Sequence, residues 1–448
     1  MNTPKKYGSA ADIYSQIDEA PFNLAQIVII ATCVLLNILD GFDITTIAVS
    51  KTAIAADIGL TASQLGLLDG IALGGMCLGA MFLGSLADLV GRRKVILTSI
   101  SSIAALMLLT AFVDNFIQFF IVRFLTGLGV GAMLASIPAI ASEYSPEKYK
   151  AMAVTIAIVG YPAGAMLGGA FGPSLIDAWG WQGVFFFGGF MTLIIAGVSY
   201  FLLPESLQFL VTKQPENALN KANAILRRID KDQVESLPPA EVGRASGALG
   251  TILGIFDNFA GLVKKEMLGK TIQLWATFFF GLFTLYFMMS WIPYMFENSG
   301  YTRDQGGQAF SLFNIGAIIG VILLGSLATR LPLSASCGAF LSCSALLMLV
   351  FSNTDLSFVG SLTLILVIGI FMQGGFTGLY ACAAKMYPSS IRATGVGWAI
   401  GVGRIGAVIG PALAGFLIEG GMDMKTNFML FAIPMFLSGI LAYSLKIK

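Results

Sequence analysis

The sequence predicts an all-α membrane protein with twelve transmembrane helices in two six-helix, pseudo-symmetric halves. Of its 448 residues, 56% are hydrophobic and only 11% are charged, which is outside the usual range of soluble globular proteins. The apolar residues gather in runs of about 20, long enough to cross roughly 30 Å of hydrocarbon as an α-helix. The runs form two groups of six with a polar stretch between them. The formal net charge of +1 gives no indication of a nucleic-acid partner.

Six apolar runs, each bounded by charged or turn residues, predict the helices of the first half. Before them, segment 1–23 is polar and has no short cleavable apolar stretch, so we expect a cytoplasmic tail and no signal peptide. The half itself is expected to cover 24–203. Its predicted helices are Leu24–Ser50, Ala62–Ala87, Val95–Phe112, Phe116–Ala141, Met152–Leu175 and Gly183–Leu203.

A polar stretch, 204–271, is the predicted linker, and it contains the step Pro238-Pro239. Its last part, Ile252–Met267, has apolar residues at helical spacing with Lys264 and Lys265 behind them. That pattern predicts an amphipathic helix on the inner membrane face. The second half, 272–448, has the predicted helices Ile272–Met295, Gln308–Leu327, Ser334–Phe351, Ser357–Ala384, Ala393–Ile418 and Phe428–Leu445.

Basic residues predict the orientation of these helices. All but five of the 26 Lys and Arg lie on the side of the termini and the linker. Lys51, Arg303 and Lys425 lie on the opposite side, and Arg123 and Arg404 lie inside helices. Because cytoplasmic loops carry an excess of Lys and Arg, we expect both termini to be cytoplasmic and the protein to lie in the inner (plasma) membrane.

The two halves repeat each other in sequence. Gly84-Ser85-Leu86-Ala87 returns as Gly325-Ser326-Leu327-Ala328, an offset of 241 residues. The Tyr-Pro region after the fourth helix, Tyr144-Ser145-Pro146, corresponds to Tyr387-Pro388 after the tenth at nearly the same offset. Parallel six-helix repeats with a substrate between them are typical of rocking transporters.

Cysteine and histidine content limits the chemistry. The five cysteines all lie in apolar runs without paired spacing, which indicates small core residues and not disulfides or a metal site. The chain has no histidine, so any proton chemistry must use carboxylates. We therefore expect no metal, no cofactor and no enzymatic activity.

Acids within the apolar runs are the candidate proton-coupling residues. Asp40 and Asp43 share one face of the first helix, and an intramembrane carboxylate is a functional-site hypothesis by default. Arg123 lies at a depth similar to that of Asp43, which permits an ion pair. Asp69, in the second helix, is interpreted as a second partner for Arg123 or a proton entry residue. The alternative is that these acids lie near the outer end and are simply hydrated.

Arg404 is the candidate anion-binding residue. It lies near the middle of the eleventh helix, and no acid of the second half lies at that depth. Such a guanidinium binds either helix-end carbonyls or an anionic ligand, and it matches a carboxylate bidentately. Aromatic and amide side chains suited to a hydroxylated ring accompany it, although most could simply pack: Tyr286, Trp291, Phe313, Asn314, Gln373, Tyr380 and Trp398.

Short motifs of the chain resemble the major facilitator superfamily. Gly84-Ser85-Leu86-Ala87-Asp88-Leu89-Val90-Gly91-Arg92-Arg93-Lys94 is similar to its loop signature, and Pro204-Glu205-Ser206 to the end of its sixth helix. The resemblance implies that Asp88, Arg92 and Arg93 form a gating latch; the second-half copy has Thr329 in place of the acid. Glu143 and Arg392, at cytoplasmic helix ends, are expected to gate by ion pairs or else to be solvated surface charges.

Within that superfamily, Asp40-Gly41-Phe42-Asp43 and Gly403-Arg404-Ile405-Gly406 resemble the aromatic acid:proton symporters. The implied function is import of a small organic anion, such as a hydroxybenzoate, with protons, by alternating access and as a monomer in the lipid bilayer. The alternatives are a carrier of another metabolite (a muconate-like or nicotinate-like acid, or a sugar), a proton/drug antiporter, or a ligand sensor without flux. Gly160-Tyr161-Pro162 lacks the adjacent Gly and Pro of the antiporter signature.

Overall fold

The computed structural model describes residues 10–19, 21–238, 262, 264–388 and 391–445. Within these residues, eleven helices are long and apolar enough to cross a membrane. One of them, α7 (Lys150–Leu202), is broken at Trp179 and Gly180, where Gly180 has a φ of 69° that favours glycine. It therefore makes two crossings, and the prediction of twelve spans is confirmed.

Each half contains six crossings. In the first half these are α2 (Leu24–Ile58), α3 (Ala62–Leu78) continued through η1 (Gly79–Leu83) and α4 (Gly84–Val90), α5 (Arg92–Thr110), α6 (Phe116–Glu143) and the two parts of α7. In the second half they are α11 (Lys265–Asn298), α12 (Arg303–Leu327), α13 (Leu333–Asn353), α14 (Phe358–Met386), α15 (Arg392–Glu419) and α16 (Met424–Tyr443).

The first helix differs from its prediction at one end. Its start matches, because Asn23 and Gln26 form a capping box that satisfies free backbone N–H groups. Its end does not, because α2 continues past Ser50 to Ile58 and stops at Gly59, whose φ is 76°. Lys51 thus lies within α2 and not in the loop after it; it is fully buried, and its charge is paired with that of Asp69.

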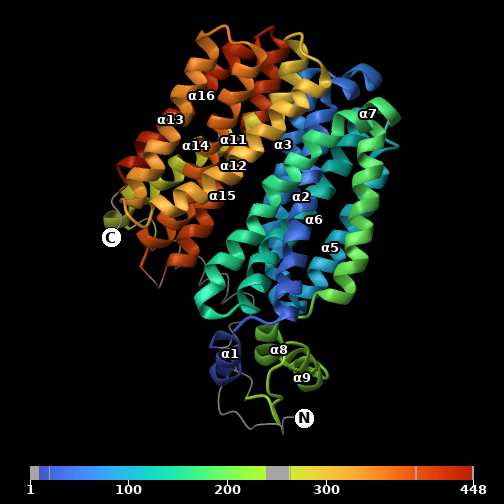
Figure 1. Ribbon diagram of the computed structural model, residues 1–448, viewed down its shortest axis with the longest axis vertical. Coiled ribbons are helices and arrows are strands. Elements are labelled where there is room, and N and C mark those ends of the chain that lie inside the picture. Colours follow the sequence, from blue (N-terminus) through green and yellow to red (C-terminus); the bar gives the residue numbers. More distant parts are fainter. Residues whose placement is uncertain (1–9, 20, 239–261, 263, 389–390, 446–448) are drawn as a thin grey trace.

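A small helical group covers one end of the first half. It consists of α1 (Ala10–Asp18), α8 (Leu207–Lys213) and α9 (Ala218–Arg228), which lie below α2 and α5 in Figure 1. Ile13, Ile17 and Leu226 are buried in it, and Asp18 forms a 2.7 Å ion pair with Lys150 at the start of α7. We refer to this end of the bundle as the α1 end. Most of the predicted interfacial helix, Ile252–Met267, lies outside the described residues.

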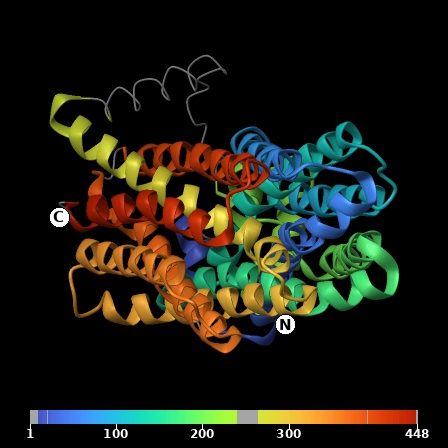
Figure 2. The same cartoon turned by 90° about the horizontal axis from the view of Figure 1, so that it is seen from above.

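The two halves lie side by side and approach each other at the end opposite α1 (Figures 1 and 2). There, Gly169 of α7 faces Gly307 of α12, and Gly66 of α3 faces the backbone of Pro411 in α15. A side chain at these glycines would separate the backbones, so small residues permit the close approach. Polar contacts reinforce it: Arg303 pairs with Asp177 at 2.5 Å, and the backbone N–H of Ser63 donates to Glu419 at 2.9 Å.

Candidate functional site

An ion pair between α2 and α6 lies inside the first half. Arg123 donates to Asp43 at 3.1 Å, and the two residues are only 2% and 4% exposed. The guanidinium Nε of Arg123 has no hydrogen-bond partner among the described residues. Because breaking a buried pair leaves an uncompensated charge, protonation of Asp43 would change how α2 and α6 interact.

Asp40 faces the second half instead. It lies one turn before Asp43 on α2 and is 3% exposed, and its Oδ2 has no hydrogen-bond partner among the described residues. The charged groups that act on it electrostatically are Asp43 and Arg404, the latter from α15 of the other half. Arg404 is partly exposed. Asp40 of the first half and Arg404 of the second half are therefore close enough to interact electrostatically, although no hydrogen bond joins them among the described residues.

Three tyrosines lie within electrostatic reach of Arg404. Tyr161 of α7, Tyr286 of α11 and Tyr380 of α14 all interact electrostatically with Arg404. The hydroxyls of Tyr161 and Tyr286 lie close to each other. Tyr161 is positioned by the tight crossing of α2 and α7, where Gly41 leaves room for the Tyr161 backbone. The resulting cluster combines one guanidinium, one free carboxylate oxygen and three phenols from both halves.

The other residues predicted to bind substrate differ in the contacts that their side chains make. Gln373 lies two turns before Tyr380 on the same face of α14, and its Oε1 is buried without a partner among the described residues. Asn314 is 1% exposed and donates to the carbonyl of Phe310 in its own helix. Trp398 stacks on Trp275, with ring centroids 6.0 Å apart. Gln373 thus offers a free acceptor, whereas Asn314 and Trp398 already have contacts within the second half.

Asp69 has a partner that the sequence did not predict. It pairs with the buried Lys51 at 2.5 Å, although it lines the same small cavity as Arg123. Lys51 was missed because the predicted first helix ends at Ser50, whereas α2 continues to Ile58. Tyr161 was missed because a single hydroxyl in an apolar run is weak evidence for a site.

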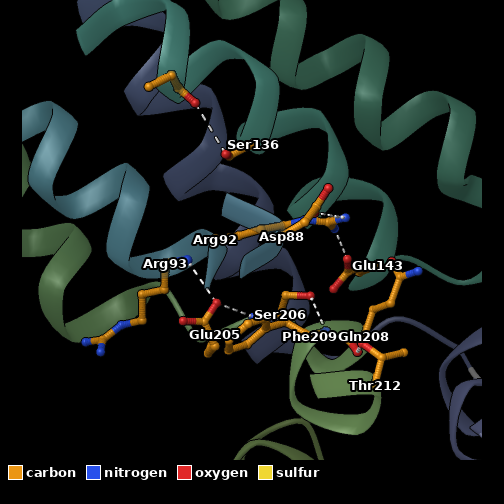
Figure 3. A network of polar contacts seen from close by, with 11 residues as sticks. Asp88, Arg92, Arg93, Ser136, Glu143, Glu205, Ser206, Gln208, Phe209 and Thr212 are labelled. Atoms are coloured by element: carbon orange, nitrogen blue, oxygen red, sulfur yellow. Dashed lines mark hydrogen bonds and ion pairs between the residues drawn. The ribbon is translucent and has the colours of Figure 1, made fainter. Parts of the chain in front are cut away.

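Four of the five predicted gating residues, Asp88, Arg92, Arg93 and Glu143, lie together at the α1 end (Figure 3). Arg92 contacts Glu143 of α6 and lies 3.5 Å from Asp88, whose side chain is 71% exposed. Arg93 donates to the carbonyl of Leu203 at 2.7 Å. All these contacts stay within the first half. Arg392, at the start of α15, is exposed and has no ion pair in the described part of the chain.

Glu205 is a residue of this network whose role the sequence did not predict. Its Oε1 accepts the backbone N–H groups of Arg93 and Ser206, each at 2.9 Å, and so caps the start of α5 (Figure 3). Gly91 has a φ of 107° there, and any side chain at that position would meet the Glu205 carboxylate. Glu205 thus links the end of α7 to the start of α5 beside the predicted latch residues.

Replacing Glu205 by Ala should destabilise the protein, because two backbone donors lose their acceptor. Loss of a helix cap costs about 0.5–2 kcal/mol, so we expect a lower unfolding temperature in a thermal melt of the purified protein. Glu216→Ala is the matched control, since Glu216 is exposed in the loop before α9. Equal melting of the two variants would show that the cap contributes nothing.

Comparison with protein-family models matches the Major Facilitator Superfamily over residues 33–332 and 274–447. The chain is 32% identical to the 4-hydroxybenzoate transporter PcaK of Acinetobacter baylyi, across 95% of this chain and 92% of that protein. It is 28% identical to a gallate transporter of Pseudomonas putida, across 96% and 94% respectively. These relatives are transporters by name, which confirms the expectation that the protein is not an enzyme.

Solved structures of the same fold are more distant in sequence. The inward-open xylose transporter XylE from E. coli is similar with a TM-score of 0.71 at 15% identity, covering 94% of this chain and 96% of that chain. A bacterial homolog of the human lysosomal transporter Spinster is similar with a TM-score of 0.70 at 16% identity, covering 94% and 97%. At this level of identity the likeness supports the arrangement of helices.

Proposed function

The chain belongs to the major facilitator superfamily, and from that premise we propose that it imports a small aromatic carboxylate together with protons by alternating access. It is a multi-pass membrane protein, and several relatives carry names of aromatic acid transporters: 4-hydroxybenzoate, gallate and 3-(3-hydroxy-phenyl)propionate. We place it in the inner membrane as a monomer. The excess of Lys and Arg supports a cytoplasmic location for the termini, so the α1 end is cytoplasmic and the opposite end is outer.

The observation that carries the substrate assignment is the position of Arg404. Arg404 is partly exposed and interacts electrostatically with three tyrosines, one from the first half and two from the second. Arg binds a carboxylate bidentately, and phenol rings supply flat apolar surface with a polar edge. The free oxygens of Asp40 and Gln373 could accept hydrogen bonds from ring hydroxyls. A hydroxybenzoate matches all these groups, whereas a sugar has no use for the guanidinium.

The proton site in this proposal is Asp43 with Arg123, and Asp40 assists. Asp43 holds a buried cation while it is ionised, so its protonation releases Arg123. Asp40 lies one turn away and faces Arg404 across the interface. A bound carboxylate would compete with Asp40 for Arg404, which favours a protonated Asp40 when substrate is present. Substrate binding and proton uptake are thereby linked through two adjacent acids on one helix.

Uptake into proteoliposomes with an imposed pH gradient tests the proposal. We expect radiolabelled 4-hydroxybenzoate to accumulate when the lumen is more alkaline than the outside. Protein-free liposomes measure passive entry of the neutral acid. 4-Hydroxybenzamide keeps the ring and the hydroxyl but has no carboxylate, so it should neither be transported nor compete. Binding without flux would instead indicate a sensor, and equal uptake of the amide would remove the role of Arg404.

A further inference from the structure

The structure buries a lysine at the interface of the two halves. Lys51 of α2 is 0% exposed, and its ammonium has several partners: Asp69 of α3 at 2.5 Å, the Ser290 hydroxyl at 2.5 Å and the Ser290 carbonyl at 2.8 Å. The Ser290 hydroxyl in turn donates to Asp69. The ring of Trp291 lies 3.7 Å from the ammonium. We call Lys51, Asp69, Ser290 and Trp291 the outer lock.

The contacts of the outer lock are divided between the two halves. Lys51 and Asp69 belong to the first half and neutralise each other, so the first half carries the charge pair by itself. Ser290 and Trp291 belong to α11 of the second half, and they receive two hydrogen bonds and the cation–π contact. Hydrogen bonds from a charged donor and cation–π contacts are strongest where water is excluded. The buried ammonium therefore joins the halves, and Trp291 is anchored by its N–H to Pro411 at 3.0 Å.

A small cavity connects the outer lock with the proton site. Its volume is about 20 Å³, room for about one water molecule. Asp69, Ser290, Arg123 and Tyr286 line it, and the unpartnered Nε of Arg123 supplies a donor beside it. One residue of each ion pair, Asp69 and Arg123, therefore lines the same cavity.

We propose that Lys51 and Ser290 hold the outer side of the protein shut, that Asp69 is the counterion of Lys51, and that release of this lock opens a water path from outside to Arg123 and Asp43. The proposal rests on the proposed alternating access. Opening must part Lys51 from Ser290 and Trp291, since these lie on opposite halves, while the Lys51–Asp69 pair can stay intact. Asp69, interpreted from the sequence as a second partner for Arg123 or a proton entry residue, is thereby assigned to gating.

Thiol accessibility tests this proposal. Ala72 lines the cavity, so Ala72→Cys in a chain whose five native cysteines are replaced reports on access to it. We expect a membrane-impermeant, positively charged thiol reagent applied from outside to label this cysteine slowly. Lys51→Met removes both hydrogen bonds to Ser290 and should raise the labelling rate on the order of tenfold or more, because hydrogen bonds from charged groups are strong.

Two further variants keep the test decisive. Ser290→Ala leaves the Lys51–Asp69 pair intact and removes only the hydroxyl, so it should raise the rate by less than Lys51→Met. Ser290→Ala also keeps the proposal testable if Lys51→Met does not fold. Lys425→Met is the matched control: Lys425 pairs with Asp355 at the same end but within the second half, and it should leave the rate unchanged. An unchanged labelling rate in both Ser290→Ala and Lys51→Met would overturn the proposed gating role of the outer lock. Because no substrate or gradient is used, this outcome is separate from failure of the transport assay.

Discussion

Asp43→Asn should abolish proton-driven accumulation while substrate exchange continues. The amide keeps the size of the side chain but cannot release or take up a proton. With one proton per anion, a gradient of one pH unit supports about tenfold accumulation, because a tenfold ratio corresponds to about 1.4 kcal/mol. In proteoliposomes we expect the variant's accumulation ratio to fall to about one. Counterflow of labelled against unlabelled 4-hydroxybenzoate should remain measurable, since it moves no net protons.

The control for this substitution must separate coupling from folding. Asp43→Asn leaves Arg123 buried without its carboxylate, so we expect a less stable protein, which size-exclusion chromatography and a thermal melt detect. Asp43→Asn/Arg123→Gln removes both charges and should recover stability but not accumulation. Asp355→Asn is the control at an exposed aspartate, whose pKa is lowered by a hydrogen bond from Lys425. Transport by this variant should be unaffected. Accumulation equal to wild type in Asp43→Asn would move the proton site elsewhere, with Asp40 the next acid to test.

Arg404→Gln should weaken binding of the aromatic carboxylate more than any other single change in the candidate site. Losing the charged partner of a buried, hydrogen-bonded carboxylate costs about 2–5 kcal/mol, equivalent to a rise in Kd of roughly 30-fold or more. Arg404→Lys keeps the charge but not the fork of parallel donors, so it should fall between wild type and Arg404→Gln. Titration of purified protein with 4-hydroxybenzoate measures these values directly.

Arg330 provides the matched control for Arg404. It is an exposed arginine in the turn after α12, so Arg330→Gln changes the same charge without touching the tyrosine cluster. Its Kd should stay within about twofold of wild type, a change of less than 0.5 kcal/mol. If Arg404→Gln also stays within that range, Arg404 serves only to hold Asp40 or helix carbonyls. Tyr286→Phe and Tyr380→Phe would then show which phenols contact the ring.

Much of the architecture could be predicted from sequence because it depends on local properties. Length and hydropathy determine whether a segment spans a membrane, so all twelve predicted segments, including the two that α7 joins across Gly180, needed no tertiary information. The Asp43–Arg123 pair was also predictable, since both positions lie at similar depth and a buried charge needs a partner. The prediction of where helix 1 ends was wrong because it also used charge. A charged residue such as Lys51 is taken to mark the membrane surface unless its buried partner is already known.

By itself, therefore, the sequence determined the twelve spans, the two-fold repeat and the presence of ionisable groups at membrane depth. The tertiary structure alone decided which groups meet across the interface of the two halves. Asp40 faces Arg404 and Lys51 faces Ser290 because the two halves pack with particular helix faces in contact, and those faces are far apart in the chain. The depth of a residue along its helix can be found by counting residues in the sequence. The rotation of a helix and the choice of its neighbour depend on packing over the whole bundle.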